Sequence, residues 1–204
     1  MAVLERKIIH DRTTLCSLVP YPQFILPRHK HVEYEIMLFT HGSGKQFVGE
    51  GVADYQEGDV ALIGSNVPHL HLCNTKLNPI ASFDVSAGEA LQFHPTIFPV
   101  SMKELPDYCS IYELLQKSQY GIRFYEKELY SKLKQLFQEI EKQEHTQRLI
   151  CLFQILEQLC LCKKTKTLSE TAYNSSNLLI EANEPVSKVY SYLFNHFKDK
   201  ITLK

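Results

Sequence analysis

Residues 29–71 constrain the fold of this chain more than any other part of its sequence. The segment opens with an H-x-H-x3-E-x6-G pattern, whose fixed positions are His29, His31, Glu35 and Gly42. Successive side chains of a β-strand alternate faces, so the shared parity of His29, His31 and Glu35 predicts that they point the same way. The segment ends with His69 and His71, which also share one parity. We therefore expect imidazole and carboxylate groups to converge inside a β-structure.

These groups make a candidate divalent-metal site. Histidine nitrogen and carboxylate oxygen suit Zn, Ni, Fe or Mn. The predicted metal ligands are His29, His31, Glu35 and His69. The alternative is that the same residues contact a small molecule without a metal. His71 and Phe39 are added as ligand-binding residues, whereas Glu33 is left out because one strand face is not expected to hold four clustered polar groups.

Short strand-like segments separated by glycine turns make up the first half of the chain. Residues 34–40 are apolar on both faces, which is typical of a strand packed between two sheets. Further strands are predicted at residues 8–9, 15–19, 24–26, 45–48, 52–55, 60–63, 69–73 and 80–85. Many short strands at close spacing favour a β-sandwich or barrel, and a jelly-roll barrel fits best.

Helical periodicity begins after about residue 99. We predict helices over residues 105–118, 124–144 and 147–162, which makes the fold class α+β. The second helix has one apolar stripe opposite charged residues. The third is apolar nearly all round, which indicates that the barrel, the preceding helix or a second copy of the chain covers it on more than one side.

The last forty residues change character twice. Residues 165–184 are rich in Ser, Thr and Asn and are predicted to be a linker. Pro185 then suits the first turn of a new helix, because its missing N–H costs nothing there. Apolar residues recur at helical spacing from Val186 to Phe197.

Three stretches carry a resemblance to known families. The H-x-H-x3-E-x6-G pattern resembles the first cupin motif, and Gly58 and His69 match the second. The chain departs from those motifs at Gln23, Gly64, Asn66 and Cys73. Residues 57–69, EGDVALIGSNVPH, look like the sensor domains of AraC-type transcription regulators. Residues 186–203, which end in Ile-Thr-Leu, look like the opening of an AraC-type helix-turn-helix domain.

The resemblance implies a domain plan. Residues 1–99 would be a cupin-type double-stranded β-helix, or jelly-roll, barrel. Residues 100–164 would be a helical region and candidate homodimer interface, followed by the linker at 165–184. Residues 185–204 would be the first helix of a truncated DNA-binding domain.

The resemblance also implies a function. A small-molecule effector in the barrel would control sequence-specific DNA binding by a domain missing from this chain, and the chain would not be an enzyme. The alternative is a metal-dependent cupin enzyme, an isomerase or a dioxygenase, with the metal as Lewis acid or oxygen activator.

Composition indicates which partners and which cellular compartment the protein is expected to have. The net charge of −1 gives the chain no global basic field that would hold DNA. The 6 cysteines form no CxxC pair and are expected to be reduced thiols, with structural roles for Cys160 and Cys162. No apolar run is long enough to span a membrane, and the N-terminus lacks a signal-peptide core. These features predict a soluble, cytoplasmic protein.

Overall fold

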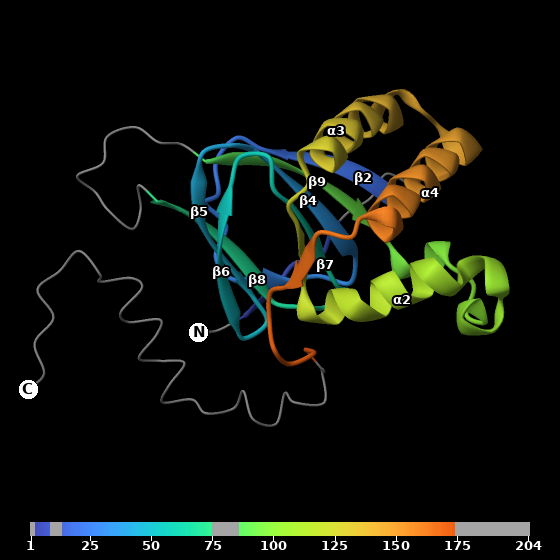
Figure 1. Cartoon of the computed structure of the whole chain (residues 1–204), viewed down its shortest axis with the longest axis horizontal. Helices are drawn as coiled ribbons and strands as arrows, with labels where there is room; N and C mark the ends of the chain where they lie inside the picture. Colours follow the sequence, from blue (N-terminus) through green and yellow to red (C-terminus); the bar gives the residue numbers. More distant parts are fainter. Residues whose placement is uncertain (1–2, 9–13, 75–85, 174–204) are drawn as a thin grey trace, which may run out of the picture.

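Two β-sheets face each other, and helices cover the outer side of the larger sheet (Figure 1). The computed structural model describes residues 3–8, 14–74 and 86–173. Within them the predicted α+β class and the cupin-type barrel are confirmed.

The smaller sheet has the strand order β1-β3-β8-β5-β6. Its strands are β1 (Leu4–Glu5), β3 (His29–Lys30), β8 (His69–Cys73), β5 (Ser43–Val48) and β6 (Gly51–Gln56). In the register of β3 and β8, His29 lies directly opposite His69. The pairing therefore brings together histidines that are forty residues apart in the sequence.

The larger sheet has the order β11-β10-β7-β4-β9-β2. Its strands are β11 (Thr165–Thr167), β10 (Ile122–Phe124), β7 (Val60–Ile63), β4 (Tyr34–His41), β9 (Ala87–Phe93) and β2 (Cys16–Tyr21). Three of these strands, β4, β7 and β9, pair in register across the middle of the sheet.

Strand β4 separates two hydrophobic cores. Its side chains alternate, so Ile36 and Leu38 join a core with the helices, whereas Met37 and Phe39 join a core between the two sheets. All four are at most 1% exposed. This confirms the prediction that residues 34–40 form a strand covered on both faces.

Three helices pack on the larger sheet: α2 (Cys109–Lys117), α3 (Lys127–Lys142) and α4 (His145–Leu161). The first two are shorter than predicted, whereas α4 begins two residues earlier and ends one residue earlier than predicted. In α3 the buried residues are Leu129, Leu133, Phe137 and Ile140, whereas Leu136, the fifth residue of the predicted stripe, is half-buried. Phe124 was expected at the start of this helix but lies in β10 instead, paired with Val60 and Thr165. None of the described helices is long and apolar enough to cross a membrane.

Two further segments differ from the prediction. Residues 24–26 form no strand, because Pro22 and Pro27 bracket them and proline cannot donate to a ladder. The predicted linker over 165–184 begins with structure that belongs to the barrel: β11 pairs with β10, and Leu168 is buried in the core between the sheets. Strands β10 and β11, which follow residue 99, are thus part of the larger sheet.

Several predicted elements lie outside the described residues. They are the strand at 80–85, the rest of the linker at 174–184 and the helix at 185–204.

Candidate functional site

Three histidines from two segments of the smaller sheet meet inside the barrel. His29 lies in β3, His31 follows it directly, and His69 opens β8. All three are at most 5% exposed. One nitrogen atom from each ring lies within 4.8 Å of the others, which is a spacing that a single ion can bridge.

Glu35 reaches this cluster from the opposite sheet. Its Oε2 lies 3.3 Å from His31 Nε2, and its Oε1 lies 3.6 Å from His69 Nε2. The predicted convergence is therefore found, although by a different route. His29 and Glu35 do not share a strand, because the chain crosses between the sheets at residues 31–33.

Backbone carbonyls orient two of the rings. His29 Nδ1 donates to Pro27 O and His69 Nδ1 donates to Val67 O, both at 2.9 Å. A carbonyl oxygen can only accept, so the proton sits on Nδ1 and the Nε2 lone pair remains available. Neither Nε2 has a hydrogen-bond partner among the described residues. Metal-binding histidines usually donate the proton of one ring nitrogen to a carbonyl or carboxylate oxygen in this way.

Burial keeps the interior imidazoles neutral. It lowers the pKa of His29, and it holds the pKa of His69 well below its usual value despite the nearby Glu35 carboxylate. Burial also lowers the pKa of His71 to about 4. Neutral imidazoles keep their lone pairs at neutral pH, as ligation requires.

Glu35 is held in the ionised form. Burial by itself would raise the pKa of its carboxyl group. The neighbouring imidazole rings and the hydrogen bond from Gln92 Nε2 outweigh burial and place that pKa well below the usual range. Three imidazoles and one carboxylate thus fit the ligand set of a divalent metal.

His71 and Phe39 occupy different positions beside this centre. His71 lines a pocket with Tyr21, Phe24, Leu26, His29, Glu35 and Met37. Phe39 is not among the lining residues. Its ring stacks on Tyr55 at 4.1 Å and contacts the edge of His71 at 5.2 Å, so it lies behind the pocket wall.

The pocket is small in this conformation. Its free volume is about 10 Å³, close to the minimum that one water molecule needs. An ion or a single water fits without change. A larger molecule needs the lining side chains to move.

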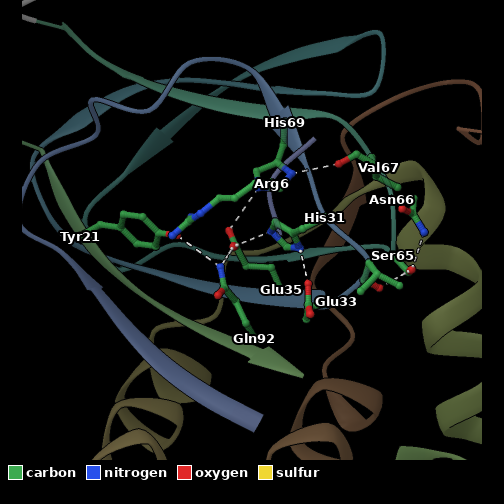
Figure 2. Close-up of polar contacts among 11 residues, drawn as sticks. Arg6, Tyr21, His31, Glu33, Glu35, Ser65, Asn66, Val67, His69 and Gln92 are labelled. Carbon is green, nitrogen blue, oxygen red and sulfur yellow. Dashed lines mark hydrogen bonds and ion pairs between the residues drawn. The ribbon is translucent and has the colours of Figure 1, made fainter. Parts of the chain in front are cut away.

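Sequence reasoning missed four polar residues around this centre. Gln92 Nε2 donates to Glu35 Oε2 at 2.7 Å and contacts the Tyr21 hydroxyl at 3.3 Å, and Arg6 donates to the same hydroxyl at 2.8 Å (Figure 2). Glu33, which the prediction left out, is 2% exposed and lies against His31. The sequence did contain a signal for Glu33, because it shares the strand parity of His31. It contained none for Gln92, Tyr21 and Arg6, which reach the centre only through sheet pairing and the N-terminal strand.

The match to a known family covers the part of the chain that contains this centre. Residues 14–71 match the model of the AraC-like ligand binding domain. No curated protein matches the chain.

Solved structures show more distant likenesses. Fatty-acid-bound ToxT from Vibrio cholerae has 12% identity over 87% of this chain and 66% of that one, with a TM-score of 0.45. The AraC-like transcriptional activator CuxR has 11% identity over 83% and 53%, with a TM-score of 0.40. Oxalate decarboxylase from Bacillus subtilis has 21% identity over 42% and 22%, with a TM-score of 0.32. This chain thus spans about a fifth of the decarboxylase.

Proposed function

Residues 14–71 of this chain match the model of the AraC-like ligand binding domain, and on that premise we propose that the chain is the ligand-sensing part of an AraC-type transcription regulator. One observation carries the proposal. The matched residues include the three histidines, Glu35 and His71, so the family match and the pocket coincide.

The effector binds inside the barrel and contacts His29, Glu35 and His71. It acts by its difference in affinity between two states of the protein, since equal affinity for both would shift nothing. The pocket has little free volume, so the state that binds a larger effector differs in the side chains around Phe24 and Met37.

Helices α2 to α4 pass this difference to a homodimer, and a separate DNA-binding domain reads the DNA. The net charge of −1 leaves residues 1–204 without the positive field that phosphate binding needs. The regulator works in the cytoplasm, where its DNA is.

The proposal includes a divalent metal ion bound at the histidine cluster. The residues that hold it are His29, His31, Glu35 and His69, and the free Nε2 atoms of His29 and His69 support this choice. The chemistry gained with such an ion is Lewis-acid polarisation of an oxygen atom of the bound molecule. The same geometry favours the second candidate function, a metal-dependent cupin enzyme.

Elemental mass spectrometry of unchelated protein, followed by a thermal-shift screen, tests the proposal. We expect bound metal that is lost in the His29→Ala/His31→Ala variant. We also expect compounds that raise the Tm of the wild type and not of His71→Leu. At 100 times Kd such binding adds about 2.7 kcal/mol to the unfolding free energy.

Two results would contradict the sensor. Turnover of a stabilising compound, followed by product analysis, would establish the enzyme instead. Tight, sequence-specific DNA binding by residues 1–204 alone would contradict the division into sensor and missing reader.

A further inference from the structure

The His31 ring lies between two buried carboxylates. Its Nε2 is 3.3 Å from Glu35 Oε2, and its Nδ1 is 3.5 Å from Glu33 Oε2 (Figure 2). Both glutamates are at most 2% exposed. Glu35 has a part in the predicted ligand set, whereas Glu33 has none.

His31 differs from the other two histidines in how its proton is placed. Carbonyl oxygens fix the Nδ1 protons of His29 and His69. A neutral His31 ring carries one proton, which faces Glu35 from Nε2 or Glu33 from Nδ1. On Nε2, the proton bonds to Glu35 and blocks coordination. On Nδ1, it faces Glu33 and frees the Nε2 lone pair.

We propose that Glu33 is a positioning residue of the metal centre: it accepts the Nδ1 proton of His31 and so presents His31 Nε2 to a divalent cation. The proposal rests on the metal site given under the proposed function. In this arrangement Glu33 accepts the Nδ1 proton of His31, just as the Pro27 and Val67 carbonyls accept those of His29 and His69. The Nε2 atoms of all three rings are then free to bind the proposed cation.

Calorimetric titration with Zn²⁺ tests this role in the whole 204-residue chain. The variants are Glu33→Gln and, as a matched control, Glu57→Gln. Glu57 Oε2 lies at the same 3.5 Å from a histidine Nδ1, that of His41, but both side chains are about 60% exposed. The His29→Ala/His31→Ala variant measures the zinc that binds to cysteines instead of the centre, and this background is subtracted.

We expect Glu33→Gln to weaken zinc binding about 10- to 100-fold, the usual effect of losing such a partner, and Glu57→Gln to leave it unchanged. Zinc binding by the wild type no stronger than the subtracted background would overturn the metal site itself. Strong binding with equal affinity in Glu33→Gln would leave the site standing and overturn only the role of Glu33.

Two further measurements distinguish a positioning role of Glu33 from a purely structural role. Long-range ¹H–¹⁵N spectra of the zinc-loaded wild type should show the His31 proton on Nδ1, and a proton on Nε2 would overturn the proposal. The metal-free Tm of Glu33→Gln should stay close to that of the wild type. A large drop in Tm with unchanged zinc affinity would make Glu33 a structural residue only.

Discussion

Two glutamines in the barrel have the same burial and different surroundings. Gln92 and Gln46 are both 0% exposed. The Gln92 amide donates to the Glu35 carboxylate at 2.7 Å, whereas neither amide atom of Gln46 has a partner among the described residues. A hydrogen bond to a charged group stabilises more than a neutral one, and an unpaired buried amide destabilises. The two glutamines should therefore respond oppositely to removal of their amides.

Gln92→Leu is expected to lower the unfolding free energy by about 1.5–3 kcal/mol, because Glu35 loses a donor. Gln46→Leu is the control of the same size and burial, and it should leave stability unchanged or raise it. Urea unfolding followed by circular dichroism measures both. Equal losses in the two variants would contradict the difference in pairing.

At this scale, the sequence predicted the ligand-type residues but not the residues that orient them. The H-x-H-x3-E pattern is local, so spacing alone singled out His29, His31 and Glu35. Gln92 lies opposite Glu35 only because β4 and β9 pair in that register, and sheet register between distant strands cannot be read from one sequence. His71 was found by its parity with His69.

The segment that follows α4 is an integral part of the barrel. Leu168 N donates to Gly121 O at 3.0 Å and Ser169 N donates to Tyr120 O at 2.9 Å. On its other side the segment packs against the turn between β5 and β6. A Cβ atom on Gly51 would lie 1.9 Å from Leu168 O, so only glycine allows this approach.

Gly51→Ala should therefore displace residues 168–169 and destabilise the protein by more than about 2 kcal/mol, in the range of other backbone clashes. Gly58→Ala is the control. Gly58 has φ +89° but nothing within 4 Å of its Cβ position, so it should cost only about 1 kcal/mol of strain. Thermal unfolding compares the two, and a Gly51→Ala effect no larger than the control would contradict the close packing.

At the element scale, the helices were predictable and their edges were not. The period of apolar residues found α3 and its buried face. Phe124 was placed at the start of that helix, yet it pairs in β10, because one apolar residue suits either element and tertiary pairing decides. The polar composition of residues 165–169 predicted a linker, although backbone pairing holds them to the sheet whatever their side chains.

At the scale of the whole molecule, helix α4 presents an apolar surface to solvent. Half of the large apolar residues of α4 are buried in the core that this helix shares with α2 and α3: Leu152, Ile155, Leu156 and Leu159. Leu149, Ile150 and Leu161 remain exposed at 38%, 44% and 66%. Neighbouring exposed apolar side chains on one helix suit a second copy of the chain as partner.

Ile150→Glu should weaken the proposed homodimer at least tenfold, because it would bury an unpaired charge at the contact. Lys134→Glu on the exposed face of α3 is the control for a charge change and should have no effect. Sedimentation equilibrium measures both. A wild type that stays monomeric at high micromolar concentration would contradict the dimer.

The return of the chain to the larger sheet has a consequence for folding kinetics. Phe124 and Thr165 are cross-strand partners although roughly forty residues separate them. The helical hairpin of α3 and α4 begins and ends at one place on the sheet. Because α3 and α4 bring Thr165 back to β10, β11 can pair only after they have formed and docked. Protection of the β11 amides should therefore appear among the last events of refolding.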